Sequence, residues 1–132
     1  MNTIKKTTAE WRAELPPDKY AVLREAATEQ PFSGDLYHNK ATGTYHCGAC
    51  KAELFKSDAK YESGSGWPSF NSPVNNKAVR LIDDDSLGMD RVEVVCANCG
   101  SHLGHVFNDA PDQPTGMRYC INSGALGFKE KT

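Results

Sequence analysis

The strongest constraint on the fold of this chain is a repeated arrangement of its cysteines. The segments "HCGACKAELF" and "VCANCGSHLG" each contain two cysteines separated by two residues, Cys47 with Cys50 and Cys96 with Cys99. In both segments a leucine follows four residues after the second cysteine, and residues 51–95 lie between the pairs. A fold for this chain must therefore explain two similar turns that are far apart in the sequence.

Four thiolates from two such pairs are a typical ligand set for structural zinc. Zinc prefers tetrahedral coordination, and a gap of two residues lets one turn direct both sulfurs at one ion. Each segment resembles a zinc knuckle, in which a strand leads into a tight turn and an apolar residue packs the turn onto the core. We therefore predict one structural zinc per chain, clipping the two ends of a β region together. The alternatives are ordinary buried cysteines, or a redox dithiol, which needs a strand–helix context that neither pair has.

The composition is ordinary for a globular protein and argues against several function classes. The chain has 132 residues, a charged fraction of 24% and a formal net charge of −2. These values predict one domain over residues 1–132, with no general attraction to nucleic acid or to a membrane surface. No segment has the apolar length of a signal peptide or a transmembrane helix, so we expect a cytoplasmic protein. The acidic run 83–85 is expected in a solvated turn.

The pattern along the chain predicts a short helical head followed by a β-rich body. Thr7 and Glu10 have the spacing of a capping box, so a helix is expected to begin near Thr8. A second helix is expected from Pro17 to about Ala27. Beyond residue 43, short runs rich in valine, isoleucine, tyrosine and phenylalanine alternate with turn-forming residues. The expected strands cover residues 44–47, 77–82, 89–96, 118–122 and 125–129.

Two histidines and a tryptophan are candidates for binding or catalysis. His102 and His105 lie three residues apart in "GSHLGHVF", directly after the second cysteine pair. His38 and His46 lack such neighbours and are expected to be structural or exposed. Trp67, in the turn-rich loop "SGSGWPSFNSPVNN", is either a core residue or the wall of an apolar pocket with a polar edge.

The fifth cysteine, Cys120, lies outside both pairs. In "GMRYCINSGA", Arg118 precedes it by two residues and Asn122 follows it by two, so a strand would place all three on one face. A nearby guanidinium favours the thiolate, which is the nucleophilic form, and an asparagine amide can orient a polar substrate group. A buried apolar cysteine is the alternative.

Taken together, these motifs resemble those of a known enzyme family. "HCGAC", "SGSGWPSF", "CANCGSHLGHVF" and "PTGMRYCINSGAL" are similar, in order and spacing, to motifs of the B-type methionine sulfoxide reductases, peptide-methionine (R)-S-oxide reductases. The resemblance covers about residues 16–129, which is the expected core of the domain. It implies a mainly β fold of two antiparallel sheets with short N-terminal helices. It also implies zinc on Cys47, Cys50, Cys96 and Cys99.

The resemblance further implies roles for single residues. Cys120 matches the family nucleophile, which would attack the sulfur of methionine-R-sulfoxide in a peptide or protein and end as a sulfenic acid. The other matching site positions are Trp67, His102, His105, Phe107, Arg118 and Asn122. Trp67 would wall the pocket for the methyl group of the substrate. A histidine of the pair, directly or through water, would give the leaving oxygen a proton.

One position departs from the family pattern. Many members carry a second, resolving cysteine where this chain has Ser65, and others use an N-terminal cysteine, which residues 1–46 lack. Either thioredoxin or another external thiol reduces the sulfenic acid directly, or Ser65 is an engineered replacement of a resolving cysteine that traps an intermediate. The runner-up function is a non-enzymatic zinc-binding module that contacts a protein through its aromatic loop. A nucleic-acid-binding zinc protein is third, disfavoured by the charge.

Overall fold

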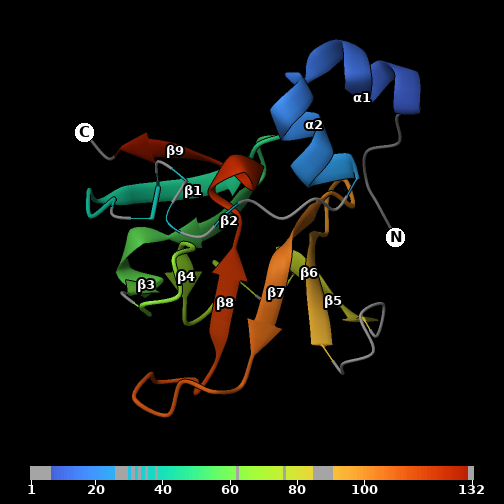
Figure 1. Cartoon of the computed structure of the whole chain (residues 1–132). Coiled ribbons are helices and arrows are strands. Elements are labelled where there is room, and N and C mark those ends of the chain that lie inside the picture. The colour runs from blue at the N-terminus through green and yellow to red at the C-terminus, as the bar shows by residue number, and fades with distance from the viewer. Residues whose placement is uncertain are drawn as a thin grey trace.

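The computed structural model shows a mainly β protein with two short helices near its N-terminal end (Figure 1). It describes residues 7–25, 30, 32, 34, 36–37, 39–61, 63–75, 77–84 and 91–130. The helices and longer strands are α1 (Thr8–Glu14), α2 (Pro17–Arg24), β1 (Gly43–Cys47), β2 (Glu53–Lys56), β5 (Val79–Asp84), β6 (Arg91–Cys96), β7 (His102–Phe107), β8 (Arg118–Ile121) and β9 (Leu126–Glu130). The short elements are β3 (Lys60–Tyr61), β4 (Ser69–Phe70) and the 3₁₀ turns η1 (Ser57–Ala59) and η2 (Ser123–Ala125).

The first helix begins where the capping box predicts. The Glu10 N–H donates to Oγ1 of Thr7 over 3.2 Å, and the Thr7 N–H donates to Oε1 of Glu10 over 3.0 Å. Both bonds satisfy backbone donors that a helix end leaves without partners. The second helix begins at Pro17, as predicted, but the predicted end is wrong. It ends at Arg24 because the next residue, at φ −116° and ψ 8°, leaves the helical conformation. Ala27 lies outside the described residues.

The five strands predicted from the sequence exist as β1, β5, β6, β8 and β9, with ends that differ by one or two residues. Residues 89 and 90 of the third predicted strand lie outside the described part. The prediction of a solvated turn at the acidic run is wrong, because residues 83 and 84 form the end of β5. Residue 85 lies outside the described part.

Four strands are absent from the prediction. β7 contains a glycine and two histidines, which interrupt the apolar alternation that marks a strand. β2, β3 and β4 have four or two residues each, which is too short to show a period. β4 lies inside the segment that was expected to be entirely loop.

The strands form two antiparallel sheets, which confirms the expected fold class. The smaller sheet has the order β2-β1-β9, and the larger has the order β3-β4-β8-β7-β6-β5. The chain passes from the larger sheet to the smaller through η2, which joins β8 to β9 (Figure 1). Buried aromatic rings connect the sheets: Phe55 of β2 stacks on Phe70 of β4 at 4.3 Å between centroids, and Tyr45 of β1 packs edge-on against Phe70 at 5.0 Å.

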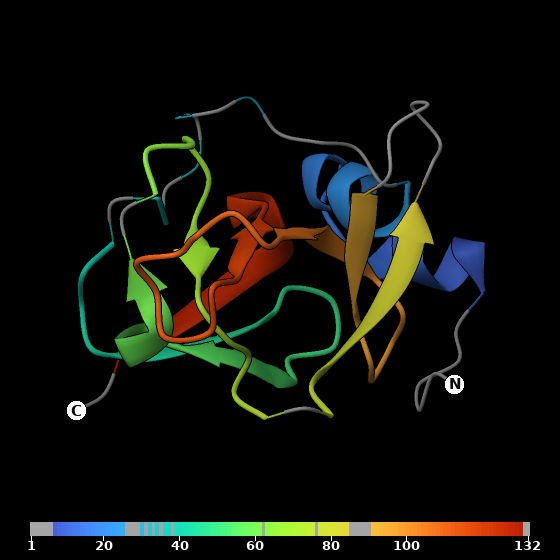
Figure 2. The same cartoon turned by 90° about the horizontal axis from the view of Figure 1, so that it is seen from below.

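The helices lie on the β5–β6–β7 side of the molecule, away from β3, as Figures 1 and 2 show. Leu23 of α2 is 1% exposed and belongs to the core. Arg24, the last residue of α2, packs its guanidinium 4.9 Å from the centroid of the Trp11 ring in α1. Neither helix in the described part of the chain has the length and apolar character needed to cross a membrane.

Candidate functional site

Cys120 belongs to a row of residues that crosses the larger sheet. In β8 it pairs with His105 of β7 on one side and with Ser69 of β4 on the other. The row continues to Glu93 of β6 beyond the histidine and to Tyr61 of β3 beyond the serine. Residues that pair across neighbouring strands point to the same face of a sheet, so these five side chains share one face.

A cavity of about 100 Å³ opens beside Cys120. It is lined by Trp67, Arg91, Gly104, His105, Phe107, Cys120 and Asn122. The two aromatic residues give the cavity apolar walls, and the histidine and the asparagine bring polar groups next to the thiol. This combination of apolar walls and a few convergent polar groups is typical of a small-molecule or side-chain binding site.

A register shift in β7 places both histidines of "GSHLGHVF" on the same face. His102 and Gly104 pair with consecutive residues of β6, so Leu103 between them is an extra residue. Without this bulge, strand residues three apart would face opposite sides of the sheet. The imidazole rings of His102 and His105 instead meet edge to face, with 5.6 Å between their centroids. His105 lines the cavity, and His102 is buried behind it.

Burial raises the pKa of the Cys120 thiol above its ordinary value. Two neighbours act in the opposite direction: the hydroxyl of Ser65, 3.8 Å from Sγ, and the guanidinium of Arg118. The expectation that Arg118 favours the thiolate is therefore correct in direction, but burial outweighs it. Burial therefore disfavours the thiolate, and a nearby base would help the thiol to act as a nucleophile.

Arg118 is held in place by two contacts at its end of β8. Its guanidinium forms a bidentate ion pair with Asp109, at 3.0 Å for each bond, and packs over the Phe107 ring at 4.5 Å from the centroid. The hydrogen bond with Asp109 raises the pKa of Arg118, and the same bond lowers the pKa of Asp109. Arg118 therefore remains a cation near the thiol.

Three serines form a cluster of hydroxyl groups next to Cys120. Oγ of Ser63 lies 2.8 Å from Oγ of Ser65 and 2.6 Å from Oγ of Ser69, and Ser69 is 1% exposed. Ser65 connects this cluster to Sγ of Cys120. The group that contacts the Cys120 sulfur from this loop is thus a hydroxyl, which can donate a hydrogen bond but cannot form a disulfide.

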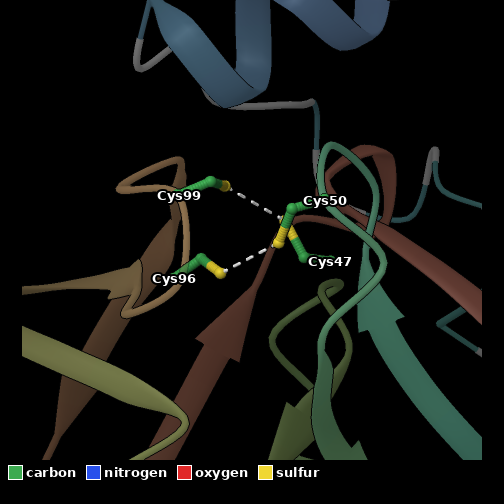
Figure 3. Close-up of side chains that lie close together, drawn as sticks. All are labelled: Cys47, Cys50, Cys96 and Cys99. Carbon is green, nitrogen blue, oxygen red and sulfur yellow. Dashed lines mark hydrogen bonds between the residues drawn. The ribbon is translucent and has the colours of Figure 1, made fainter. Parts of the chain in front are cut away.

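The four paired cysteines come together below the helices in the view of Figure 3. Cys47 ends β1 and Cys50 lies in the turn that follows it, and Cys96 and Cys99 are arranged in the same way at the end of β6. All four sulfurs lie within 4.8 Å of one another, with 3.7 Å between Cys47 and Cys99 and 3.6 Å between Cys50 and Cys96. Tetrahedral zinc with Zn–S bonds of about 2.3 Å requires sulfurs about 3.8 Å apart, so the cluster could hold such an ion.

Polar groups around the cluster stabilise its sulfurs. Nδ2 of Asn98 donates to Sγ of Cys50 over 3.2 Å, and Oγ of Ser101 lies 3.1 Å from Sγ of Cys99. Arg24 donates from Nη1 to Ser101 Oγ over 3.2 Å and to the Cys99 carbonyl oxygen over 3.1 Å. α2 is therefore tied directly to one turn of the cluster, as is common for the residues that surround metal ligands.

Comparisons with known proteins agree with this arrangement. Residues 15–130 match the family described as the SelR domain. The chain is 56% identical to the peptide methionine sulfoxide reductase MsrB of Methanosarcina mazei over 130 residues, which cover 98% of this chain and 92% of that protein. The chain belongs to the B-type methionine sulfoxide reductase family. Proteins of the same name from Leptospira interrogans and Thiobacillus denitrificans are each 54% identical, covering 97% and 96% of this chain and 97% and 95% of their own lengths.

The structure gathers the site residues that the resemblance to this reductase family implies. Five of them line the one cavity: Trp67, His105, Phe107, Cys120 and Asn122. Arg118 lies outside its lining and acts on Cys120 through its charge, and His102 lies behind His105. Asn122 also has a structural part, since its Nδ2 donates to the carbonyl oxygen of Leu103 over 3.0 Å.

The other two histidines of the chain are His46 and His38. His46 is partly buried in β1, with Nδ1 3.2 Å from the Cys47 carbonyl oxygen. His38 lies outside the described residues.

Several residues in or near the cavity are missing from the sequence-based set, and three of them have charged side chains. Arg91 lines the cavity, Glu93 contacts His102, and Asp109 pairs with Arg118. The alternation in "DRVEVVC" does place Arg91 and Glu93 on one strand face. That this face is the one beside Cys120 follows only from the order of the strands in the sheet.

Proposed function

We propose that this protein reduces the R epimer of methionine sulfoxide, in peptides or proteins, to methionine, with Cys120 as the nucleophile. The observation that carries the proposal is the cavity that brings the Cys120 thiol together with Trp67, Phe107 and His105. A methionine sulfoxide side chain carries an apolar methyl group beside a polar oxygen, and the cavity offers surfaces for both. Because the sulfoxide sulfur is chiral, one asymmetric pocket serves one epimer.

The chemistry moves one oxygen atom from the substrate to Cys120. The cysteine sulfur attacks the sulfoxide sulfur, and the products are a cysteine sulfenic acid and a thioether. The cysteine sulfur loses two electrons and the methionine sulfur gains them. His105 is the proposed proton carrier, because it lines the cavity and pairs directly with Cys120. It would take the thiol proton and deliver it, directly or through water, to the departing oxygen.

External thiols would regenerate the enzyme. Every cysteine other than Cys120 belongs to the four-cysteine cluster, and the loop residue whose side chain contacts the Cys120 sulfur is a serine, Ser65. A first thiol, from thioredoxin or another reductant, would form a mixed disulfide with Cys120 and release water. A second would release the reduced cysteine. A reducing compartment such as the cytoplasm suits both this cycle and the four reduced cysteines.

We also propose that the cysteine cluster holds one structural zinc ion. Four sulfur ligands complete the tetrahedral shell, so no position remains for a substrate. The ion would connect the turn after β1 in the smaller sheet to the turn after β6 in the larger one. This proposed link between the two sheets, together with the family match over residues 15–130, supports a single reductase domain.

The proposal is tested by following racemic methionine sulfoxide, free and in a peptide, in the presence of dithiothreitol. We expect the R epimer to be consumed and the S epimer to remain. If a folded, metal-containing sample consumes neither epimer, the proposal is wrong. That result would revive the alternative of a zinc-binding interaction module, which family membership does not favour.

A further inference from the structure

Glu93 has a contact that the proposed chemistry does not yet use. Its Oε2 lies 2.6 Å from Nδ1 of His102. The histidine is only 6% exposed, and the Glu93 side chain is 23% exposed. A carboxylate can only accept hydrogen bonds, so the proton of this bond belongs to Nδ1 of His102. The short distance is typical of a charge-assisted bond, which holds both the orientation and the tautomer of the ring.

The other ring nitrogen of His102 is also buried. Among the residues that the structure describes, Nε2 of His102 has no hydrogen-bond partner. Buried polar atoms without a partner are uncommon, because they lose their contact with water and gain nothing in return. A histidine that served only to fill the core would have no need of a carboxylate at one nitrogen and an open position at the other.

The strand pairing links this contact to the catalytic cysteine. Glu93 of β6 pairs directly with His105 of β7, which in turn pairs with Cys120 of β8. The bulge at Leu103 brings His102 onto the same face, where its ring meets the His105 ring edge to face. Glu93 thus contacts His102, whose ring packs against the cavity-lining His105. Glu93 itself does not line the cavity.

We propose that Glu93 is a positioning residue for the reduction, and this rests on the proposed function. It holds His102 as the Nδ1–H tautomer in one ring orientation. The fixed His102 ring restricts the rotamers of His105, so that His105 keeps the orientation in which it lines the cavity together with Cys120. Without Glu93, His102 can rotate and exchange tautomers, and His105 loses its support.

The test compares Glu93→Ala and Glu93→Gln, with Glu53→Ala as the matched control. Glu53 is an exposed glutamate that lies opposite His46 in the other sheet. We expect Glu93→Ala to lower kcat for the R sulfoxide by about tenfold or more, with little change in KM, because proton transfer rather than binding is impaired. Glu93→Gln should recover much of the loss, since its amide oxygen can still accept from Nδ1. Glu53→Ala should behave like the unchanged protein.

Nitrogen NMR of the His102 ring gives a readout that a merely structural role would not produce. The unchanged protein should show the Nδ1–H tautomer, and Glu93→Ala should show a mixture of tautomers. An Nε2–H tautomer in the unchanged protein, or a normal kcat in Glu93→Ala, overturns the proposal. If Glu93→Ala does not fold, the Glu93→Gln kinetics and the spectrum of the unchanged protein still decide. If the unchanged protein reduces no sulfoxide, the proposed function is wrong and the kinetic role falls with it, whereas the spectrum still reports the Glu93–His102 bond.

Discussion

The hydroxyl oxygen of Ser65 lies 3.8 Å from the sulfur of Cys120. No other cysteine of the chain is available to Cys120, because the remaining four form the cluster between the sheets. This relationship decides how the enzyme can be recycled. A sulfenic acid on Cys120 meets a hydroxyl where a resolving thiol would otherwise stand, so the first turnover should end at the sulfenic acid.

The change Ser65→Cys should introduce a resolving thiol. The new sulfur would start close to Cys120, and Gly64 and Gly66, at φ 77° and 94°, flank it with backbone conformations that favour glycine. We expect one turnover without reductant to produce a disulfide between residues 65 and 120, and activity with thioredoxin to increase. Peptide mapping under non-reducing conditions would detect the cross-link.

The matched control for this variant is Ser63→Cys. Ser63 belongs to the same hydroxyl cluster but contacts Ser65 and Ser69 rather than Cys120. It should leave the sulfenic acid intact and reactive to a dimedone-type trap. A lasting sulfenic acid in the Ser65→Cys protein, with no cross-linked peptide, would show that position 65 does not reach the sulfur of Cys120.

Loss of one cysteine of the cluster should abolish the proposed zinc binding. Cys47→Ser or Cys99→Ser removes one of four sulfurs, and at such sites metal binding and folding are coupled. We expect zinc to fall well below one ion per chain and the melting temperature to drop by roughly 10 °C or more. Elemental analysis and thermal unfolding measure both. Cys120→Ser is the control and should retain its zinc, whereas a metal-free protein of unchanged stability would contradict the zinc assignment.

The reactivity of Cys120 towards an alkylating agent should depend on Arg118. Burial raises the thiol pKa, and the Arg118 cation partly opposes that rise. Arg118→Met removes the cation and leaves Asp109 behind, so the pKa should rise further and less thiolate should be present at neutral pH. We expect alkylation of Cys120 at pH 7 to slow by about tenfold, with the pH profile moved to higher pH.

Lys129→Met is the control for this measurement. Lys129 is an exposed cation of β9, in the sheet that does not contain Cys120. Its removal should not change the pH profile of Cys120 alkylation. Mass spectrometry of the labelled peptides would distinguish Cys120 from the cluster cysteines. An unchanged profile in Arg118→Met would mean that the guanidinium does not act on the thiol.

Much of the site can be predicted from short spacings between residues in the sequence. Two cysteines in one tight turn, or Arg118 and Cys120 two residues apart in a strand, have relative positions that the backbone geometry determines. Trp67 could be assigned to the pocket only through the family resemblance, because its loop has no periodic pattern. The strands with regular alternation were found, whereas β7 was not, since Gly104 and the histidines interrupt it.

The rest depends on contacts between distant segments. Glu93 reaches the site only because β6 lies beside β7 in the sheet, and a bulge at Leu103 decides which face His102 shares. The balance of effects on Cys120 is also a tertiary property. Sequence spacing predicts the nearby Arg118, but the burial that outweighs its effect on the pKa arises from the packing of the whole site.

The transfer of the R-sulfoxide oxygen to Cys120 is the step on which the proposed function depends. It is tested most directly by a single turnover without reductant, on separated epimers of a peptide sulfoxide, with methionine and trapped sulfenic acid measured together. We expect one methionine per chain from the R epimer, an equal amount of sulfenic acid on Cys120, and neither product from folded Cys120→Ser protein. Comparable turnover of the S epimer, or methionine formation by Cys120→Ser at the rate of the unchanged protein, would contradict it.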